Sequence, residues 1–314
     1  MVTPSPSSIQ KTSDHWNKKS GPSFNWWSNE IVCRYINKLV CGHSIPGLSR
    51  GVINLAVKKA KELNVTFNKG LSIGCGIGSK ELYLLRTGIV RHITCYDLAE
   101  KRLIHARQSA KALGLEDRVN FILGDAFADF SFNRTRGEYD LVYWNNSLHH
   151  MPNTSLALEW SRVALTNGGM LILDEYVGPN YIQFTDKMIE FGNLVRDSLP
   201  ASKLIYPGET IDTYKSKKNI LTRPNLKRLI EKDPSEASDS ENIMPALKTF
   251  FPNALIKRTG GAVYFCTLPP LYINFDMSNQ EDRNLMALLM LLDEMYLNLD
   301  PDSSLYAAAL AIVY

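Results

Sequence analysis

The stretch Lys69–Leu85 reads KGLSIGCGIGSKELYLL: an apolar run leads into three glycines within five positions and then into a segment with helical spacing. Gly74, Gly76 and Gly78 therefore lie between a predicted strand and a predicted helix. Glycine lets backbone approach a ligand closely, and the amides at a helix amino terminus attract small anionic or polar groups. The spacing is GxGxG, not the GxGxxG or GxxxxGK[ST] of dinucleotide and triphosphate sites. A tight turn without any ligand is the alternative.

Segments around this turn alternate between short apolar strands and amphipathic helices. The expected strands are residues 70–73, 92–96, 119–123, 139–144 and 170–174, and the expected helices are 80–86, 101–113 and 155–165. This alternation predicts βαβ units and an α/β, doubly wound, mostly parallel sheet covered on both faces. Residues 254–258 and 305–314 read as two strands that flank a helix at 281–299. We expect them to close a seven-stranded sheet with an antiparallel edge hairpin.

The remaining segments suggest additions to this sheet. Residues 1–25 are rich in Ser, Pro and Lys and predict a flexible tail, and residues 26–64 contain two stretches with helical spacing that predict a lid. Residues 65–180 are the predicted core, residues 181–250 a helical cap insertion over a ligand cleft, and residues 251–314 the closing strands with a helical excursion.

Composition narrows the class of protein but names no partner. The 314 residues include 35 basic and 32 acidic side chains, a formal charge of +3, with no long basic run for nucleic acid or a membrane surface. The five cysteines show no CxxC spacing, so neither disulfides nor a metal site is indicated. Without an apolar leader or a membrane span, we expect a cytoplasmic protein. A homodimer through the terminal hairpin is an open alternative.

Two aspartates follow the next two predicted strands. Asp97 ends the stretch HITCYD, where a carboxylate at the carboxyl end of a strand can bind the two hydroxyls of a ribose. Asp125 ends VNFILGD, where its carboxylate and the amide of Ala126 can contact the edge of an adenine. Either aspartate alone reads as a turn or cap residue. Two at successive strand ends favour one shared ligand that contains a ribose.

Five stretches between Leu71 and Asn180 extend this pattern in one order: LSIGCGIG, ITCYDLAEKRL, VNFILGDAF, YDLVYWNNSLHHMP and LTNGGMLILDEYVGPN. In this order they resemble class I S-adenosylmethionine-dependent methyltransferases, which implies a Rossmann-like fold and that cofactor, with S-adenosylhomocysteine as product. The contacts that the resemblance implies are Gly74, Cys75, Gly76 and Gly78 at the methionine part, Asp97 and Leu98 at the ribose, Asp125 and Ala126 at the adenine, and Asn145 near the sulfonium. Many members have an acid where this chain has Ser72, so carbonyls or water are expected to bind the cofactor ammonium.

Two further motifs concern the acceptor. The ending DEYVGPN and the stretch DPSEA, Asp233–Ala237, are similar to an uncharacterised group of bacterial methyltransferases, some of which accompany surface-glycan biosynthesis. The predicted helical lid and the long insertion after the fifth strand would enclose a modest pocket, which favours a small-molecule or glycan-precursor acceptor over a large duplex. Trp26 and Trp27 are candidates to cover the cofactor or to stack on a sugar-like acceptor, and the alternative is a staple onto the core.

Methyl transfer from a sulfonium is an in-line displacement, which needs alignment and, for some nucleophiles, removal of a proton. His149 and His150 follow the fourth core strand; His149 is the candidate general base, and His150 a candidate acceptor contact, because histidine titrates near neutrality. Glu175 and Tyr176 leave the fifth strand and are candidates to orient an acceptor and to act on it. The alternative roles are packing of the loop for His149 and fixing of the following turn at Gly178 for Glu175 and Tyr176.

These features favour an S-adenosylmethionine-dependent methyltransferase, an enzyme of the EC 2.1.1.- class. A transferase that moves another group from the same or a decarboxylated cofactor is the nearest enzyme alternative, and the GxGxG spacing disfavours a dehydrogenase. A cofactor-binding sensor or scaffold of the same fold without turnover is the alternative from another class.

Overall fold

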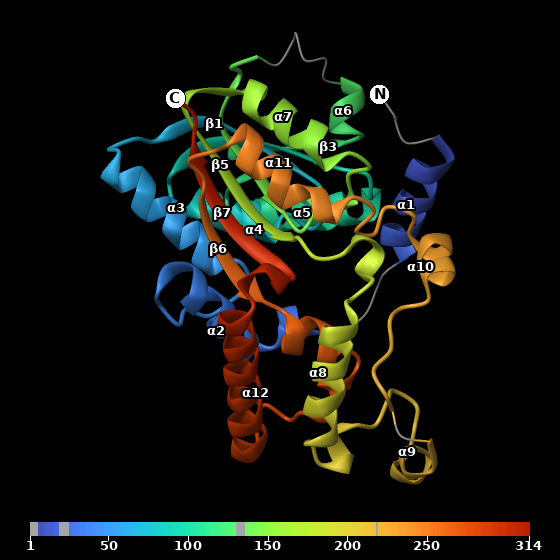
Figure 1. Cartoon of the computed structure of the whole chain (residues 1–314). Helices are drawn as coiled ribbons and strands as arrows, with labels where there is room; N and C mark the ends of the chain where they lie inside the picture. Colours follow the sequence, from blue (N-terminus) through green and yellow to red (C-terminus); the bar gives the residue numbers. More distant parts are fainter. Residues whose placement is uncertain (1–5, 19–24, 130–135, 218) are drawn as a thin grey trace.

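The computed structural model describes residues 6–18, 25–129, 136–217 and 219–314 (Figure 1). The strands are β1 (Phe67–Ile73), β2 (Val90–Asp97), β3 (Val119–Leu123), β4 (Tyr139–Asn145), β5 (Leu165–Tyr176), β6 (Leu255–Gly260) and β7 (Tyr306–Ile312). The α-helices are α1 (Pro6–Lys18), α2 (Glu30–Cys41), α3 (Arg50–Glu62), α4 (Ser79–Arg86), α5 (Glu100–Ala112), α6 (Ala126–Asp129), α7 (Thr154–Ala164), α8 (Asp186–Asp197), α9 (Ile211–Lys217), α10 (Leu226–Lys232), α11 (Ile243–Phe250) and α12 (Gln280–Leu299). Among the described residues, no helix is both long and apolar enough to cross a bilayer.

The seven strands form one sheet in the order β3-β2-β1-β4-β5-β7-β6. Strands β1 to β5 are parallel, whereas β7 is antiparallel to both of its neighbours. Strands β6 and β7 are separated in the chain by α12, so the edge pair encloses a helical excursion. The predicted doubly wound sheet with an antiparallel edge hairpin is therefore confirmed.

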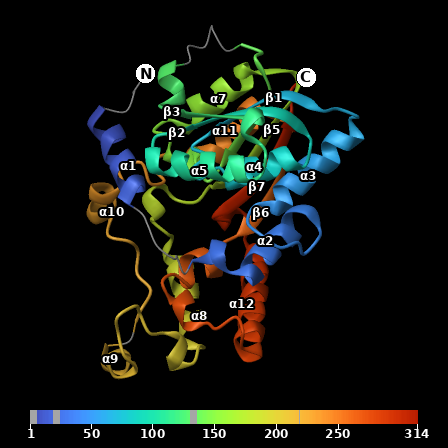
Figure 2. The ribbon, with the colours of Figure 1, turned by 180° about the vertical axis from the view of Figure 1, so that it is seen from behind.

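Helices cover both faces of the sheet, and strand β4 shows how the sequence allows this. Leu141 and Tyr143 belong to one buried apolar cluster, which includes residues of α3, α4 and α5 (Figure 2). Val142 and Trp144 belong to the other cluster, with residues of α7 and α11 (Figure 1). Successive side chains of a strand point to opposite faces, so a strand buried on both sides is apolar throughout.

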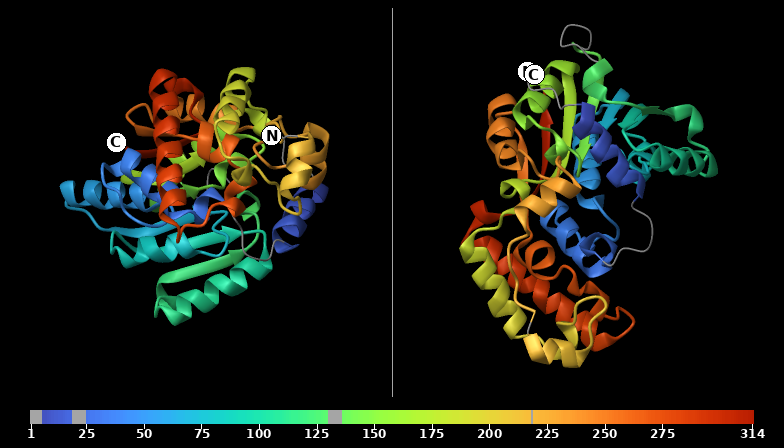
Figure 3. Two further views of the ribbon diagram at one scale, coloured as in Figure 1. Left: turned by 90° about the horizontal axis from the view of Figure 1, so that it is seen from below. Right: turned by 90° about the vertical axis from the view of Figure 1, so that its right-hand side faces the viewer.

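The helical excursion lies at the carboxyl edge of the parallel strands. β6 ends at Gly260 beside Tyr306, which pairs in turn with Tyr176 at the end of β5. Both α8 and α12 contact the helical segment Ala262–Thr267, and α12 also contacts α2. Together these helices form a lobe below the sheet (Figures 1 and 3), which we call the helical lobe. Open α/β sheets bind ligands at this edge, so the lobe lies on the ligand side.

A buried carboxylate joins the parts of the helical lobe. Asp293 of α12 accepts hydrogen bonds from the backbone amides of Gly261 and Val263, the latter at 2.6 Å, and from the Tyr35 hydroxyl of α2 at 2.9 Å. Burial raises the pKa of Asp293 to about 6, although these donors oppose the shift. The lobe is thus held by one carboxylate that contacts two helices and the end of β6.

Two predicted additions differ from the structure. The flexible tail predicted for residues 1–25 is wrong for residues 6–18, which form α1 beside α5 (Figure 3); residues 1–5 and 19–24 lie outside the described residues. The cap predicted for residues 181–250 is not one unit, because α8 belongs to the helical lobe whereas α11 packs on α7 against the sheet. Hydrogen bonds and one tryptophan, not an apolar stripe, hold α1, so its polar composition was misleading.

Candidate functional site

The glycine turn between β1 and α4 has the left-handed backbone that the sequence suggested. Gly74, Gly76 and Gly78 have φ values of +71°, +59° and +69°. A Cβ atom on Gly74 would lie 2.6 Å from the Cβ of Ser147, and one on Gly78 would lie 2.9 Å from the Phe121 ring. Two of the glycines are therefore required by the neighbouring strand ends as well as by their own φ angles.

Asp97 joins this turn to the end of β2. Its Oδ2 accepts a hydrogen bond of 2.7 Å from the Gly76 amide, and its Oδ1 accepts one of 2.8 Å from the Ala99 amide. Burial raises the pKa of the Asp97 carboxyl. The structure thus brings the glycine turn and Asp97 together, as the strand-end argument expects. Contact of Asp97 with a ribose stays a prediction.

Helix α1, which the sequence analysis missed, lies against the same loop. Ser13 Oγ donates a hydrogen bond of 2.8 Å to the carbonyl oxygen of Leu98, the residue predicted beside the ribose. The Trp16 ring lies under the Arg102 guanidinium at 4.2 Å and meets the His150 ring edge to face at 5.6 Å. Only these long-range contacts reveal the relation of α1 to the site. A polar segment with one tryptophan gives no such signal in the sequence.

At the end of β3, Asp125 acts as a turn or cap residue, which was its alternative interpretation. Its Oδ1 accepts a hydrogen bond of 2.9 Å from the Phe127 amide at the start of α6. Ala126 is buried beside it. Contact of either residue with an adenine stays a prediction.

The end of β4 carries a polar network that the sequence analysis found only in part. Asn145 Oδ1 accepts from Ser49 Oγ at 3.4 Å and from the Lys80 ammonium, which also lies 3.4 Å from the Asn145 carbonyl oxygen. Burial lowers the pKa of Lys80. Burial also raises the pKa of Asp174 to about 6, although Ser49 and Lys80 favour its charged form.

A buried carboxylate lies on α4 next to this network. Glu81 is 1% exposed, and its Oε1 accepts a hydrogen bond of 2.9 Å from Ser72 Oγ. Its Oε2 has no partner among the described residues. Burial raises the pKa of Glu81. A carboxylate nine residues later in the chain thus lies beside Ser72. Binding of the cofactor ammonium by carbonyls or water stays a prediction.

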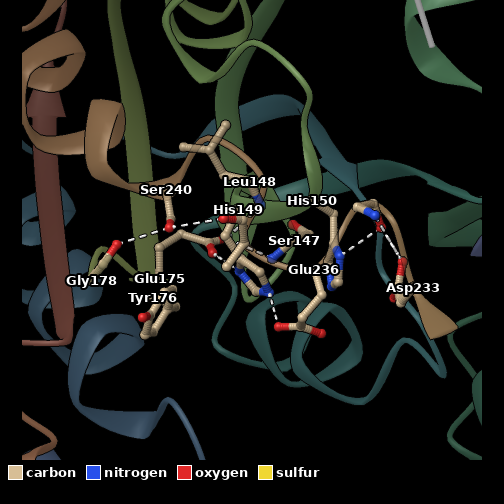
Figure 4. Close-up of polar contacts among 12 residues, drawn as sticks. Ser147, Leu148, His149, His150, Glu175, Tyr176, Gly178, Asp233, Glu236 and Ser240 are labelled. Atoms are coloured by element: carbon tan, nitrogen blue, oxygen red, sulfur yellow. Dashed lines mark hydrogen bonds and ion pairs between the residues drawn. The ribbon is translucent and has the colours of Figure 1, made fainter. Parts of the chain in front are cut away.

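Glu175 organises the loop after β4 (Figure 4). It is fully buried, and its Oε1 accepts from the amides of Ser147 at 2.6 Å and Leu148 at 2.8 Å. Its Oε2 lies 2.7 Å from Nδ1 of His149. Burial alone would lower the pKa of His149, but the hydrogen bond and charge of Glu175 raise it overall. Both Glu175 oxygens are therefore engaged by the loop after β4, and not by the turn at Gly178 that was its alternative role. Contact of Glu175 with an acceptor stays a prediction.

Tyr176 and Trp26 also have packing roles. The Tyr176 hydroxyl donates a hydrogen bond of 2.9 Å to the Pro179 carbonyl, which fixes the turn after β5, and burial holds its pKa well above the usual value. Trp26 is buried against Tyr306 at 5.2 Å between ring centroids, whereas Trp27 is 38% exposed. The catalytic role predicted for Tyr176 has no support in this geometry.

A small cavity lies beside the network at the end of β4. Trp26, Ser49, Asp174, Tyr264 and Tyr306 are among its lining residues. The indole nitrogen of Trp26 is buried without a hydrogen-bond partner among the described residues. Its volume is about 10 Å³, which is room for one water molecule and not for an organic ligand.

Comparisons with known proteins agree with the central part of the chain. Residues 71–169 match the family model described as a methyltransferase domain. The chain is 34% identical to methyltransferase GfsG of Streptomyces halstedii over 113 residues, and this match covers 34% of this chain and 37% of that protein. It is 31% identical over 111 residues to the 27-O-demethylrifamycin SV methyltransferase of Amycolatopsis mediterranei, and this match covers 34% of this chain and 38% of that protein. The matches thus span little more than a third of each relative.

Two solved structures resemble the chain over almost its whole length. The phosphoethanolamine N-methyltransferase 2 of Haemonchus contortus, in complex with phosphomonomethylethanolamine and S-adenosylhomocysteine, has a TM-score of 0.52 at 14% identity, covering 98% of this chain and 61% of that one. The second is the geranyl diphosphate C-methyltransferase of Streptomyces coelicolor in complex with Mg²⁺, geranyl diphosphate and S-adenosyl-L-homocysteine. Its TM-score is 0.52 at 10% identity, and the match covers 99% of this chain and 100% of that one. These likenesses show the fold, which is the Rossmann-like fold of methyltransferases.

Proposed function

We propose that this chain is an S-adenosylmethionine-dependent methyltransferase that acts on a small molecule or a glycan precursor. The observation that carries the proposal is the hydrogen bond between Asp97 and Gly76, inside the segment that matches a methyltransferase domain. It joins a glycine turn to a carboxylate at the carboxyl edge of a sheet of this fold. In the proposed complex the methionine part lies at Gly74–Gly78, the ribose at Asp97 and Leu98, and the adenine at Asp125 and Ala126.

The cofactor ammonium would bind at Asn145. Two oxygens of this residue already contact an ammonium group, that of Lys80. We propose that the cofactor ammonium displaces Lys80 and that the buried Glu81 supplies the negative charge which Ser72 lacks. Glu81→Gln should then weaken S-adenosylmethionine binding about 10-fold or more, the size of one hydrogen bond to a charged group. Glu100→Gln, at an exposed position on α5, is the matched control.

The acceptor would bind beside Asn145, and the cavity there, of about 10 Å³, would have to widen to admit it. Its aromatic walls suit a small organic acceptor, and the Asp174 carboxyl and the Trp26 indole nitrogen can each hydrogen-bond an acceptor hydroxyl. These two groups would fix the nucleophile relative to the sulfonium. Alignment of that kind is the main contribution a protein makes to an in-line displacement.

His149 is our candidate for the group that takes the acceptor proton. A carboxylate only accepts, so the hydrogen bond to Glu175 places the proton of a neutral His149 on Nδ1 and leaves Nε2 free to receive another. His149→Asn should lower kcat about 10²- to 10⁴-fold for a hydroxyl acceptor. A neutral amine acceptor should show no such loss, because it needs no base before the transfer.

Isothermal titration tests the cofactor proposal directly. The chain would be titrated with S-adenosylmethionine, S-adenosylhomocysteine and NAD, in parallel with Asp97→Ala and with Asp117→Ala, an exposed aspartate near β3. Binding of both sulfur cofactors, lost only in Asp97→Ala, is expected. No binding of either would contradict the proposal. Binding without methylation of any acceptor in a metabolite and sugar-nucleotide screen would favour a sensor or scaffold.

A further inference from the structure

A cluster of metal-ligating side chains lies where the loop after β4 meets a turn from much later in the chain. His149 and His150 come from the segment Leu148–His150, and Glu236 comes from the turn after α10 (Figure 4). One ring nitrogen of each histidine and one Glu236 carboxylate oxygen all lie within 4.8 Å of one another. The two imidazole rings are neighbours in space as well as in sequence, with centroids 4.3 Å apart.

Hydrogen bonds at the other ring nitrogens fix both histidines in the same tautomer. His149 donates its Nδ1 proton to Glu175, which can only accept. Ser235 Oγ donates its own proton to Asp233 at 2.6 Å, so it accepts at 3.0 Å from His150 Nδ1. Both Nε2 lone pairs are therefore left for another partner. Metal-binding histidines are held in this way, with the outer nitrogen bonded to a carboxylate, carbonyl or other oxygen.

We propose that His149, His150 and Glu236 bind a divalent transition-metal ion. His149 Nε2 lies 3.9 Å from Glu236 Oε1. This separation is at the upper end of the roughly 3–4 Å expected between two ligands that each lie about 2.1 Å from one ion. The Glu236 side chain is 28% exposed and the histidines are held by their neighbours, so a small rotation of Glu236 closes the site. Asp233, 3% exposed, keeps one oxygen without a partner among the described residues, which leaves a further anionic group beside His150.

The ligand set decides which ions fit. Two imidazoles and one carboxylate favour Zn²⁺, Fe²⁺, Co²⁺ or Mn²⁺ over Mg²⁺, which prefers an all-oxygen shell. Three protein ligands leave open positions, in which water or an oxygen of the acceptor can bind and lose its proton more easily. Binding of an acceptor oxygen to the ion rests on the proposed function. Since Nε2 of His149 has a single lone pair, the metal-bound protein uses His149 as a ligand and not as the base.

A titration with Co²⁺ tests the site without any cofactor. The metal-stripped chain would be titrated with Co²⁺ followed by visible absorption, and then with Zn²⁺ in competition, with Mg²⁺ as the comparison ion. Glu236→Gln and His150→Gln should each weaken Co²⁺ binding by more than about 100-fold, beyond the roughly 10- to 100-fold loss expected for an outer partner. Glu241→Gln removes an exposed acid five residues away and should leave binding unchanged.

The outcomes separate this inference from the proposed function. One equivalent of Co²⁺ that Zn²⁺ displaces, lost in Glu236→Gln and His150→Gln alone, supports the site. Absence of binding at millimolar Co²⁺ and Zn²⁺, or binding that both variants retain, overturns it. Absorption typical of thiolate ligands would assign the ion to cysteines and also overturn it. S-adenosylmethionine titrations of the same variants report on the cofactor site independently, because none of these ligands touches the glycine turn or Asp97 in the structure.

Discussion

Replacement of Glu175 by glutamine should change the tautomer of His149. The carboxylate accepts three hydrogen bonds, of 2.6, 2.8 and 2.7 Å, from Ser147, Leu148 and His149. The glutamine oxygen can keep the two backbone amides, and its NH₂ group then faces Nδ1 of His149. Two donors cannot pair, so the ring proton moves to Nε2 and Nδ1 becomes the acceptor. The position that we assign to a metal or a proton is thereby blocked.

The magnitude follows from the bonds that change. Hydrogen bonds to a charged group contribute about 1.5–3 kcal/mol each and neutral ones about half as much. Three weaker bonds, offset by the removal of a buried charge, give an expected loss of about 1–3 kcal/mol in the free energy of unfolding. Co²⁺ affinity should fall about 10- to 100-fold, as for other outer partners of metal ligands. Urea unfolding and Co²⁺ titration measure these two quantities.

Nitrogen NMR of the imidazole decides whether the reasoning holds. The wild-type ring of His149 should carry its proton on Nδ1, and the ring in Glu175→Gln should carry it on Nε2, with Glu241→Gln as the unchanged control. If the variant kept the Nδ1 proton and its Co²⁺ affinity, Glu175 would not orient this histidine.

The same variant should alter the pH dependence of stability. The raised pKa of His149 favours its charged form in the folded state, so the contribution to stability is complete below the usual value of 6.5 and is lost as the pH rises through the higher folded pKa. In Glu175→Gln burial dominates and lowers this pKa. The stability difference between wild type and variant should therefore shrink as the pH rises above 6.5.

Three other changes test the fold around the site. Gly74→Ala should lose about 1–2 kcal/mol from its left-handed backbone plus the cost of the clash with Ser147, and Gly74→Ala/Ser147→Gly should recover the second part in urea unfolding. Asp293→Asn should remove a stability term of up to about 3 kcal/mol that wild type loses as the pH rises from 4 to 7, because burial raises the folded pKa of Asp293 from 3.8 to about 6; equal pH profiles would contradict this. Arg196→Met should lower the free energy of unfolding by about 3 kcal/mol or more, because the buried guanidinium donates to the Thr267 carbonyl at 2.9 and 2.7 Å and to two further carbonyls; a loss below about 1 kcal/mol in urea unfolding would show that water replaces it.

The sheet could be predicted from the sequence because its signals are local. Strands β1 to β4 are short runs that end at, or just before, a glycine, an aspartate or an asparagine, and the turn at Gly74–Gly78 needs left-handed backbone. The pairing of β6 with β7 across 45 intervening residues, 261–305, was also predicted, because both segments read as strands and the helix between them is bounded by turns. Local periodicity does not give the packing partner of a helix, which is why α11 was assigned to a cap.

The site could be predicted only where its residues follow strands. Asp97 reaches Gly76 because parallel strands of one sheet end at one edge. The hydrogen bond from His149 to Glu175 spans 26 residues, and that from His150 to Ser235 spans 85. No spacing rule relates such residues, so neither the fixed tautomers nor the metal cluster has a sequence signal. The same holds for the approach of Ser13 to Leu98.

Strand β5 explains why the polar groups around its end form two separate sites. Asp174 and Glu175 are neighbours, and successive side chains of a strand point to opposite faces. Asp174 therefore lines the cavity on the side of α2, with Ser49, whereas Glu175 holds the loop of His149 on the other side. Each carboxylate is buried; Glu175 accepts three hydrogen bonds, and Asp174 accepts from Ser49 and Asn145. Asp174 is thus the group that we propose to hydrogen-bond an acceptor at the end of β5, and Glu175 supplies a rigid support for the loop that carries His149.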